Sequence, residues 1–99
     1  MKIKWTHEAL DRLIEIEEYI SKDSPSRAVQ FMDQLIEHAE VLSDKPRIGR
    51  IVPELANTDI RELVFKKRRI VYRLKPKCIE ILTVFEGHRM LRIDECDVS

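Results

Sequence analysis

The stretch that decides the fold is IRELVFKKRRIVYRLKPKCIEILTVFEGHRMLR, residues 60–92. Side chains of alternating character occupy Ile60–Phe65 and Ile70–Lys75, and β-forming residues are densest in Cys78–Phe85. Alternation with a period of two is typical of strands that bury one face. Turn residues separate these runs at Lys66–Arg68 and Lys75–Lys77. The stretch therefore predicts a three-stranded antiparallel meander, with Cys78–Phe85 as a central or long strand.

Upstream of the meander, the pattern predicts a short strand over Lys2–Trp5 and two helices. The first helix begins after Thr6, whose hydroxyl can accept a hydrogen bond from the first turn, and continues to about Ser21. The second begins at Ser24-Pro25, because proline is tolerated at the first helical position, and ends near Asp44. The apolar stripes predicted to face the core are Leu10, Leu13, Ile14 and Ile20, with Ala9 and Ile16, then Ala28, Phe31, Met32, Leu35, Ile36, Ala39 and Leu42.

The helices are joined by about three residues, which predicts an antiparallel hairpin whose apolar faces cover one face of the sheet. The predicted fold class is α+β, with the order β-α-α-β-β-β, in one domain over residues 1–99. Lys45–Asp59 contains two prolines and one glycine and is predicted to be a loop, with Gly49 in a backbone conformation closed to other residues. The predicted buried residues include Leu13, Ile20, Phe31, Leu35, Tyr72, Ile81 and Val84.

The composition is that of a small folded domain, with 43% hydrophobic and 36% charged residues. No apolar run approaches the roughly 20 residues that span a bilayer, and no signal peptide opens the chain. We therefore expect a cytoplasmic protein with no membrane association. Cys78 and Cys96 lack a CxxC spacing, so no zinc site is predicted. A disulfide between them is not expected in the cytosol. We expect no metal and no cofactor.

The charges are unevenly distributed along the chain, although the formal net charge is zero. Residues 1–44 carry five Lys/Arg and ten Asp/Glu, a net charge of −5. Residues 45–77 carry eleven and three, a net charge of +8, and residues 78–99 carry two and five, a net charge of −3. The basic segment is either a footprint for a polyanion or an acidic protein, or a solvated strand pair that balances the acidic helices.

Few residues offer catalytic chemistry. His7 and His38 are predicted to be surface residues of the helices. His88 stands beside Arg89, so it is either an acid or base acting on a phosphodiester or a turn histidine without a role. Tyr72 either stacks on a base or belongs to the core. Arginine binds phosphate with a planar fork of N–H donors. The arginines cluster in the second half of the chain, at Arg47, Arg50, Arg61, Arg68, Arg69, Arg73, Arg89 and Arg92.

Residues 2–92 resemble the RelE/ParE superfamily of toxins from bacterial type II toxin–antitoxin systems. The resemblance lies in several short segments taken together and in order. These segments are Asp23-Ser24-Pro25 with Ala28 and Phe31, Leu42, Pro46, Gly49-Arg50, Pro53-Glu54-Leu55, Ile60-Arg61-Glu62-Leu63, Arg69-Ile70-Val71-Tyr72-Arg73 and Ile79-Glu80-Ile81-Leu82-Thr83-Val84. The resemblance implies a β-α-α-β-β-β domain whose partner is an acidic or amphipathic tail of a cognate antitoxin.

The superfamily divides in function. RelE-like members cleave mRNA on the ribosome, with basic residues on these strands and a tyrosine or histidine near the C-terminus. ParE-like members poison DNA gyrase and lack that set. Arg69 matches the arginine of the RelE-like Tyr-Arg-Leu-Val-Tyr strand, and Arg89 can match the arginine after the last strand. The lysine pair of the preceding strand is not reproduced, because Arg61 can replace only one member and Glu62 offers no second base.

The C-terminal part departs further from the ribonucleases, since no tyrosine follows Tyr72. Glu86 stands where many ParE-like members have a histidine, and His88 is displaced from that position by two residues. We therefore expect a toxin that is not an enzyme and that acts on DNA gyrase. The alternatives are a metal-independent ribosome-dependent mRNA endonuclease, with Arg61, Arg69, His88 and Arg89 as its catalytic residues, and an inactive member that only binds its antitoxin.

In each case the basic segment is the expected binding surface. We predict that the antitoxin or target is bound on one accessible face by Arg50, Arg61, Arg69, Arg73 and Arg89. The antitoxin is expected to wrap the domain, either with an amphipathic segment against the helices or with a strand added at a sheet edge.

Overall fold

The computed structural model describes residues 1–52, 55 and 59–86. The elements follow one another as β1 (Lys2–Trp5), α1 (His7–Ser21), α2 (Pro25–Glu40), the short 3₁₀ helix η1 (Val41–Ser43), β2 (Arg50–Ile51), β3 (Ile60–Phe65), β4 (Arg68–Leu74) and β5 (Cys78–Glu86). The predicted α+β class is confirmed, and so are the three strands of the meander. The sequence also predicts a turn at Glu86–Arg89 that leads to a short strand or an irregular segment ending near Ile93, and residues 87–93 lie outside the described ranges.

Both helices begin at the predicted capping residues. The Thr6 hydroxyl accepts a hydrogen bond from the amide of Ala9 at 3.1 Å, and the Ser24 hydroxyl accepts one from the amide of Arg27 at 3.3 Å. Pro25 occupies the first turn of α2, where its missing amide hydrogen has no helical partner to lose. No helix within the described part of the chain is long and apolar enough to cross a membrane.

The sheet has five strands in the order β1-β5-β4-β3-β2. β1 pairs with β5 in parallel, whereas the other neighbours are antiparallel. β2 corrects the prediction that Lys45–Asp59 is entirely a loop, because Arg50 pairs with Glu62 and Ile51 with Arg61. Two residues are too few to show an alternating pattern, so the sequence carries no periodic signal for this strand.

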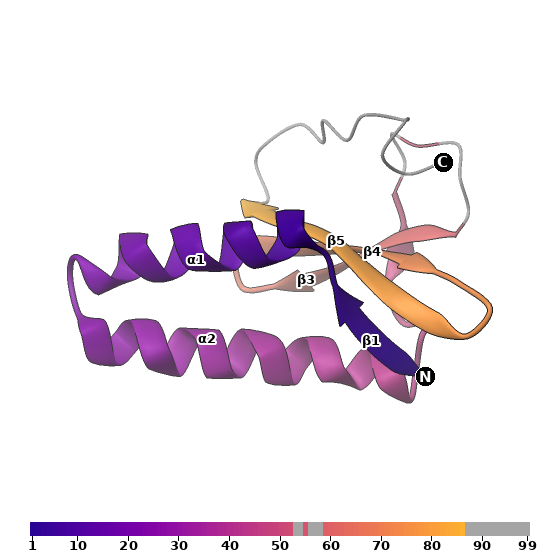
Figure 1. The fold of residues 1–99 in the computed structure, drawn as a ribbon, viewed down its shortest axis with the longest axis horizontal. Helices are drawn as coiled ribbons and strands as arrows, with labels where there is room; N and C mark the ends of the chain where they lie inside the picture. The colour runs from indigo at the N-terminus through magenta and orange to yellow at the C-terminus, as the bar shows by residue number, and fades with distance from the viewer. Residues whose placement is uncertain (53–54, 56–58, 87–99) are drawn as a thin grey trace.

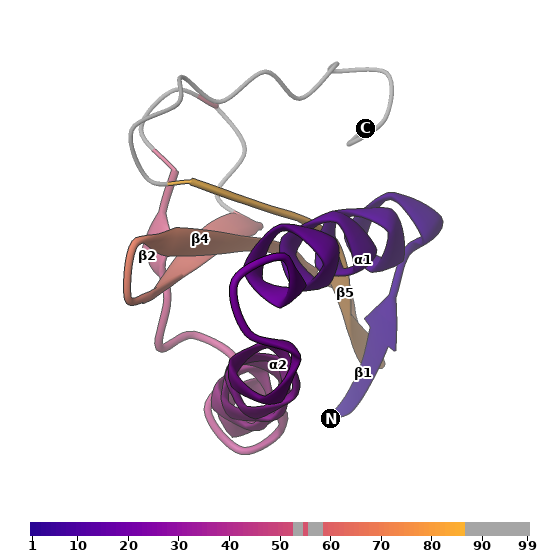
Figure 2. The same ribbon diagram turned by 90° about the vertical axis from the view of Figure 1, so that its left-hand side faces the viewer.

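The molecule has two layers, with the sheet on one side and both helices packed on one of its faces (Figures 1 and 2). Between the layers lies the main core, which includes all seven residues predicted to be buried. Five of them are fully or nearly fully buried, and Ile20 and Phe31 are partly buried. We call the face of the sheet that points away from the helices the second face.

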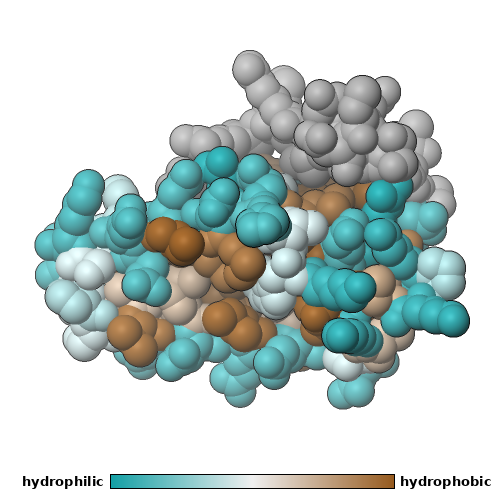
Figure 3. Space-filling model, viewed as in Figure 1, coloured by the Kyte–Doolittle hydropathy of each residue, from teal (hydrophilic) through white to brown (hydrophobic). Residues whose placement is uncertain are grey.

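The predicted apolar stripe of α1 is partly wrong. Ala9, Leu13 and Ile16 are buried, but Leu10 and Ile14 are 43% and 55% exposed. Successive residues of a helix are rotated by about 100°, so the buried arc that passes through Leu13 leaves Leu10 and Ile14 at its rim. The space-filling view shows the resulting apolar surface over the helices (Figure 3).

A bulge in β5 sets which of its side chains face the helices. Val71 pairs with Thr83 and Tyr72 with Ile81, so Leu82 has no residue opposite it in β4. The side chain of Thr6 donates toward the carbonyl oxygens of Ile81 and Leu82, at 2.8 and 3.0 Å, and thereby ties the start of α1 to the bulge. Ile79, Ile81 and Val84 consequently join the main core, whereas Leu82 and Phe85 belong to a smaller cluster on the second face.

Gly49 is required for a reason other than the predicted one. It does not have a positive φ angle. A Cβ atom at this position would instead collide with the side chain of Tyr72 and would lie 2.6 Å from the carbonyl oxygen of Glu62. The glycine therefore permits a close approach between the chain before β2 and the strands beside it.

Candidate binding site on the second face of the sheet

A buried carboxylate lies on the second face, on the strand next to the edge strand β2. The side chain of Glu62, on β3, has 0% of its area exposed. Its neighbours along that side of β3 are Ile60, which is buried, and Val64, which is exposed. A charged group without solvent requires partners of opposite charge, because burying an unpaired carboxylate is strongly unfavourable.

Two arginines from the strands on either side supply that charge. Arg50 on β2 donates from Nε to Glu62 Oε1 at 2.5 Å, and Arg69 on β4 places Nη1 3.3 Å from Glu62 Oε2. The contact with Arg69 is an ion pair that lacks the geometry of a hydrogen bond. The side chain of Arg50 is 62% exposed and that of Arg69 18%. We call Arg50, Glu62 and Arg69 the Glu62 cluster. It contains two cations and one anion, so it carries a net positive formal charge.

Apolar packing surrounds this cluster. Val52, Ile60, Val71 and Leu82 are buried together on the second face, and Leu55 and Phe85 pack against them. The guanidinium carbon of Arg69 lies 5.9 Å from the centroid of the Phe85 ring, which is a cation–π distance. Arg69 is therefore held from two sides, by a carboxylate and by an aromatic ring.

Only part of the predicted arginine surface is brought together. Arg73 alternates with Val71 and Arg69 along β4, so it lies on the second face with the cluster. The prediction that Arg61 shares this face is corrected by the structure. Arg61 precedes Glu62 in β3, so its side chain points to the opposite side of the sheet. Its Nη1 donates to the carbonyl oxygen of Gly49 at 2.9 Å. The remaining predicted residues, His88 and Arg89, lie outside the described residues.

Tyr72 is a core residue and not a surface ring available for stacking. It is fully buried, and its hydroxyl donates to the carbonyl oxygen of Pro46 and accepts from the amide of Gly49, both at 2.9 Å. Burial raises the pKa of Tyr72, and the hydrogen bond from Gly49 and the nearby charge of Arg61 oppose that rise. The tyrosine thus anchors the segment that leads into β2.

The described residues offer little for acid–base or metal chemistry near the cluster. His38 lies on α2, where Nε2 is 3.2 Å from the carbonyl oxygen of Val64, and His7 is exposed at the start of α1. No group of three His, Cys, Asp or Glu side chains in the described ranges could hold a metal ion. The arrangement on the second face is suited to binding an anion.

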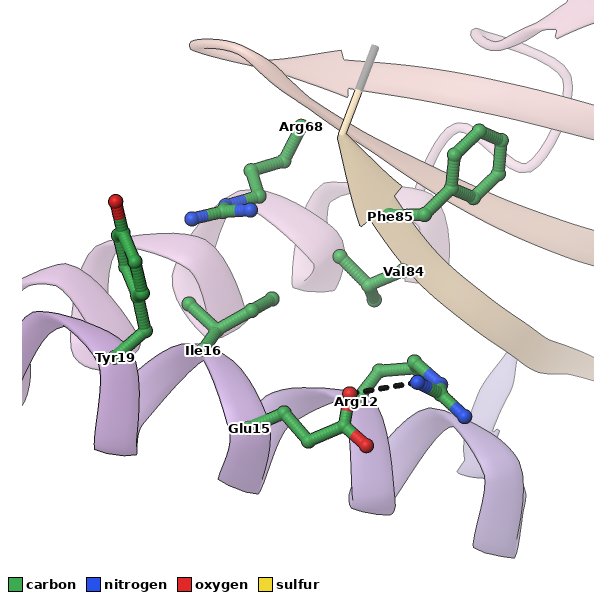
Figure 4. Close-up of a pocket in the computed structure, with 7 residues that line it drawn as sticks. All are labelled: Arg12, Glu15, Ile16, Tyr19, Arg68, Val84 and Phe85. Carbon is green, nitrogen blue, oxygen red and sulfur yellow. Dashed lines mark hydrogen bonds and ion pairs between the residues drawn. The ribbon is translucent and has the colours of Figure 1, made fainter. Parts of the chain in front are cut away.

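A groove also opens on the side of the molecule where α1 meets the end of β5 (Figure 4). It has a volume of about 210 Å³ and is lined by Arg12, Glu15, Ile16, Tyr19, Arg68, Val84 and Phe85. Arg12 forms ion pairs of 2.6 Å with both Glu8 and Glu15, and these pairs lower the pKa of Glu8 and raise that of Arg12. Of the charged residues that line this groove, Arg12 and Glu15 are thus paired with each other.

Glu62 is the organising residue of the site, although the sequence pattern predicted no role for it beyond the lack of a second base on this strand. Two features of the sequence pointed to Glu62. This charged residue lies on the same side of a predicted strand as the apolar Ile60, and the predicted hairpin brings Arg69 of the next strand beside it. The contribution of Arg50 required β2, which the sequence did not reveal.

Comparison with known proteins places the chain in a family. Residues 3–91 match the family described as the ParE toxin of the type II toxin–antitoxin system parDE. A protein of Sinorhizobium fredii assigned as the toxin Y4kP is 37% identical over 93 residues, which cover 89% of this chain and 90% of that protein.

Two solved structures have the same fold. A chain from the chromosomal ParDE toxin–antitoxin system of P. aeruginosa has a TM-score of 0.74 and 25% identity, over 87% of this chain and 95% of that one. A chain from the toxin–antitoxin complex RelBE2 of Mycobacterium tuberculosis has a TM-score of 0.63 and 20% identity, over 86% and 95%, and supports the fold alone. The family match covers nearly the whole chain, and the protein belongs to the ParE toxin family of type II toxin–antitoxin systems.

Proposed function

We propose that this ParE toxin inhibits growth by acting on DNA gyrase, without catalysing a reaction of its own, and that a cognate antitoxin neutralises it. The observation that supports the proposal is the burial of Glu62 between Arg50 and Arg69. RelE-like ribonucleases resemble this chain but carry a second basic residue on this strand. Here a carboxylate occupies the strand and engages Arg69, which leaves that arginine occupied as an anchor rather than available to a reacting phosphate.

The direction of Arg61 supports the same proposal. A ribonuclease of this superfamily would need its basic groups to converge on one phosphodiester. Arg61 and Arg69 are on opposite sides of the sheet, and Arg61 donates to the chain before β2. Removing one group of such a catalytic set typically lowers a rate by about 10²–10⁴, so a set that does not converge is a poor basis for cleavage.

Two assays performed side by side test the proposed target. Induction of the toxin alone should arrest growth, and the purified protein should inhibit DNA supercoiling by gyrase while leaving mRNA on translating ribosomes intact. Cleavage of ribosome-bound mRNA that disappears in His88→Ala would instead establish the ribonuclease alternative. Absence of growth arrest would identify an inactive, antitoxin-binding member.

Charge complementarity supports docking of the antitoxin on the second face. Residues 45–77 have a net charge of +8, and complementary charge accelerates association and sets register more than it adds affinity. The relatives with solved structures come from toxin–antitoxin systems. An acidic partner segment lying on the exposed part of Arg50 and on Arg73 would satisfy both observations.

Charge reversal tests that docking surface directly. Arg50→Glu combined with Arg73→Glu should slow association with the antitoxin and weaken its dependence on salt, because two cations of the surface become anions. The matched control is Lys22→Glu with Lys45→Glu, which makes the same charge change at exposed positions away from the second face. Equal rates and equal salt slopes for the two double variants would exclude the second face as the docking surface.

A further inference from the structure

A cleft on the helix side of the molecule, between α2 and the turn that joins β3 to β4, presents positive charge. It has a volume of about 310 Å³ and is lined by Ile20, Arg27, Gln30, Phe31, Gln34 and Lys66. Two kinds of polar group line it, cations and amides, and no carboxylate is among these lining residues. A concave surface that gathers cations without a lining anion attracts an anionic ligand.

The charge of Lys66 is held in this cleft by contacts with α2 and with two aromatic rings. Its Nζ donates to Gln34 Oε1 at 3.1 Å and lies 5.3 Å from the centroid of the Phe31 ring and 5.4 Å from that of Phe65. An ammonium group has three N–H donors, and this hydrogen bond uses one of them. The lysine is therefore positioned while it keeps donors for a further acceptor.

The orientation of Gln34 adds further donors to the cleft. Its Oε1 accepts the hydrogen bond from Lys66, so the amide nitrogen of the same side chain offers its N–H groups to a ligand. Arg27, earlier on the same helix, brings the planar fork of a guanidinium group. Donors from α2 and from the turn thus line one space, which suits an oxyanion.

The turn contains a residue that its backbone does not favour. Phe65 pairs with Arg68, so Lys66 and Lys67 form the loop of the hairpin. Lys66 has a φ angle of 54°, the one positive value among the non-glycine residues that the structure describes. Glycine is the usual residue at a hairpin position with positive φ, because a Cβ atom is disfavoured there sterically. Such an outlier is a reason to look for a function of the side chain.

This cleft is separate from the two sites already described. Glu62 lies on the second face, whereas Phe65 packs against the main core on the helix side and is followed directly by Lys66. In the groove of Figure 4, Arg12 is paired with Glu15. The cleft at Lys66 gathers its cations without a carboxylate among its lining residues.

We propose that this cleft binds a phosphate group of a DNA backbone, and that the DNA is the segment held by gyrase. Arg27 and Lys66 pair with the phosphate oxygens, and the amide nitrogen of Gln34 donates to one of them. The identity of the DNA rests on the proposed function, because gyrase is the partner that brings DNA to the toxin. A contact with the backbone positions the protein without reading the base sequence.

The surroundings of the cleft favour a backbone phosphate over a free nucleotide or an acidic peptide. Lys66 Nζ and the guanidinium carbon of Arg68 lie 5.3 and 5.9 Å from the centroid of the Phe31 ring, so cations occupy the ring on which a nucleotide base would stack. Lys67 is exposed on the same turn. Successive phosphates of one strand, about 3.4 Å apart along the axis, can approach both lysines, which a single carboxylate cannot do.

The first test is a fluorescence anisotropy titration of labelled duplex DNA of about two helical turns with the full-length protein, at several salt concentrations. Arg27→Gln with Lys66→Gln should weaken binding about tenfold or more and lower the slope of log affinity against log salt by about one to two. The matched control is Lys2→Gln with Lys4→Gln, which removes equal charge from exposed positions of β1, a strand that β5 and β4 separate from β3. Equal weakening by both double variants would overturn the site.

Gln34→Glu separates binding at the cleft from folding. The substitution keeps the size of the side chain and an acceptor for Lys66, but it replaces amide donors with a negative charge. DNA binding should weaken about tenfold or more, while the melting temperature stays the same or rises because Lys66 gains an ion pair. A stable variant that binds DNA as tightly as the parent would overturn the proposal.

NMR titrations of the isotope-labelled full-length protein distinguish the possible ligands. The duplex should shift the amides of Gln34 and Lys66 at concentrations at which a mononucleotide and a glutamate-rich peptide leave them unchanged. Shifts with the mononucleotide or with the peptide, and none with the duplex, would overturn the assignment to a DNA backbone. No shift with any of the three would overturn the site itself.

Binding to gyrase is measured separately, with and without bound DNA. The parent should bind the gyrase–DNA complex about tenfold more tightly than gyrase alone, and Arg27→Gln with Lys66→Gln should abolish that difference. A parent that inhibits supercoiling but binds gyrase equally well with and without DNA would refute the phosphate contact and leave the gyrase target standing. A parent that binds duplex DNA at the cleft but does not inhibit supercoiling would support the site and refute the proposed target.

Discussion

The two faces of the sheet are stabilised in different ways. On the helix face, Leu13, Leu35 and their neighbours form a continuous apolar core between sheet and helices. On the second face, a smaller apolar cluster surrounds a buried glutamate and the arginines that pair with it. Apolar burial is non-directional, so any well-filled arrangement of the helix face is stabilising. The ion cluster stabilises one geometry, because its atoms must meet at particular distances. The difference indicates that the helix face maintains the fold and that the second face presents charge.

The largest expected effect lies in the core of the helix face. Leu35→Ala should lower the free energy of unfolding by about 2–5 kcal/mol, because Leu35 is 0% exposed and its truncation leaves a cavity. Ile14→Ala, at a position that is 55% exposed, should cost less than about 1 kcal/mol. Chemical denaturation of the two variants measures the contrast, and similar losses would mean that the buried arc of α1 and α2 has been placed wrongly.

The next effect concerns the buried charge of the second face. Glu62→Ala should lower the free energy of unfolding by about 1–3 kcal/mol, because Arg69 keeps a largely buried charge without its partner. Glu62→Gln preserves the volume and one acceptor, and it should cost less than the alanine variant. If both variants were as stable as the parent protein, the cluster would contribute nothing and the contrast between the two faces would disappear.

A smaller effect is expected at Tyr72, a residue of the helix face whose hydroxyl anchors the segment that leads into β2. Tyr72→Phe removes the hydrogen bonds to Pro46 and Gly49 and should cost about 1–2 kcal/mol at neutral pH. Tyr19→Phe is the matched control, since Tyr19 is 70% exposed.

The pH dependence of the same variant sharpens this result. Because the folded-state pKa of Tyr72 is raised above 10.0, its contribution is fully present below that pH and is lost as the pH rises through the folded pKa. The parent should therefore lose more stability than Tyr72→Phe on going from pH 9 to pH 11, a range set around the ordinary tyrosine pKa of about 10. Parallel pH profiles for parent and variant would show that Tyr72 ionises as easily in the folded state as in the unfolded state.

The smallest effect is expected at the exposed end of the cluster. Arg50→Ala should change the free energy of unfolding by about 1 kcal/mol or less, because its side chain is 62% exposed and the ion pair is screened by solvent. Arg69→Ala should cost more, since only 18% of its side chain is exposed and it also packs on Phe85. Thermal unfolding at low and high salt measures both, and a larger loss for Arg50 would reverse the assigned order of the two arginines.

Much of the fold could be predicted from residue patterns, because those patterns reflect local physics. The Thr6 and Ser24 caps, the helical spacing of α2 and the alternation in β3 each act within a few residues. The rim of α1 was predicted less well, since Leu10 and Ile14 are apolar but the angle of the helix against the sheet decides which apolar residues are covered.

The candidate site could be predicted only in part. The sequence predicted the excess of positive charge in residues 45–77 and the placement of Arg50, Arg69 and Arg73 on one face of the domain. The assignment of Arg61 to the same surface ignored the alternation of neighbouring residues within a strand, which sends Arg61 and Glu62 to opposite sides. The alternation of Ile60–Phe65 predicts this difference, because it places Ile60, Glu62 and Val64 on one side of the strand and Arg61 on the other.

The sequence by itself determined the two helices, the strands β1, β3, β4 and β5 and the strand region that carries the charge, because capping, periodicity and charge density are properties of neighbours along the chain. The resemblance over residues 2–92 also pointed to the family. Only the tertiary structure decided that Arg50 and Arg69 meet at Glu62, and that Gly49 must lack a side chain where Tyr72 passes. These contacts join residues on different strands, and their existence depends on β2 and on the register of the sheet. A register is a property of the folded sheet, in which the strands align so that apolar side chains are buried and the buried carboxylate is paired.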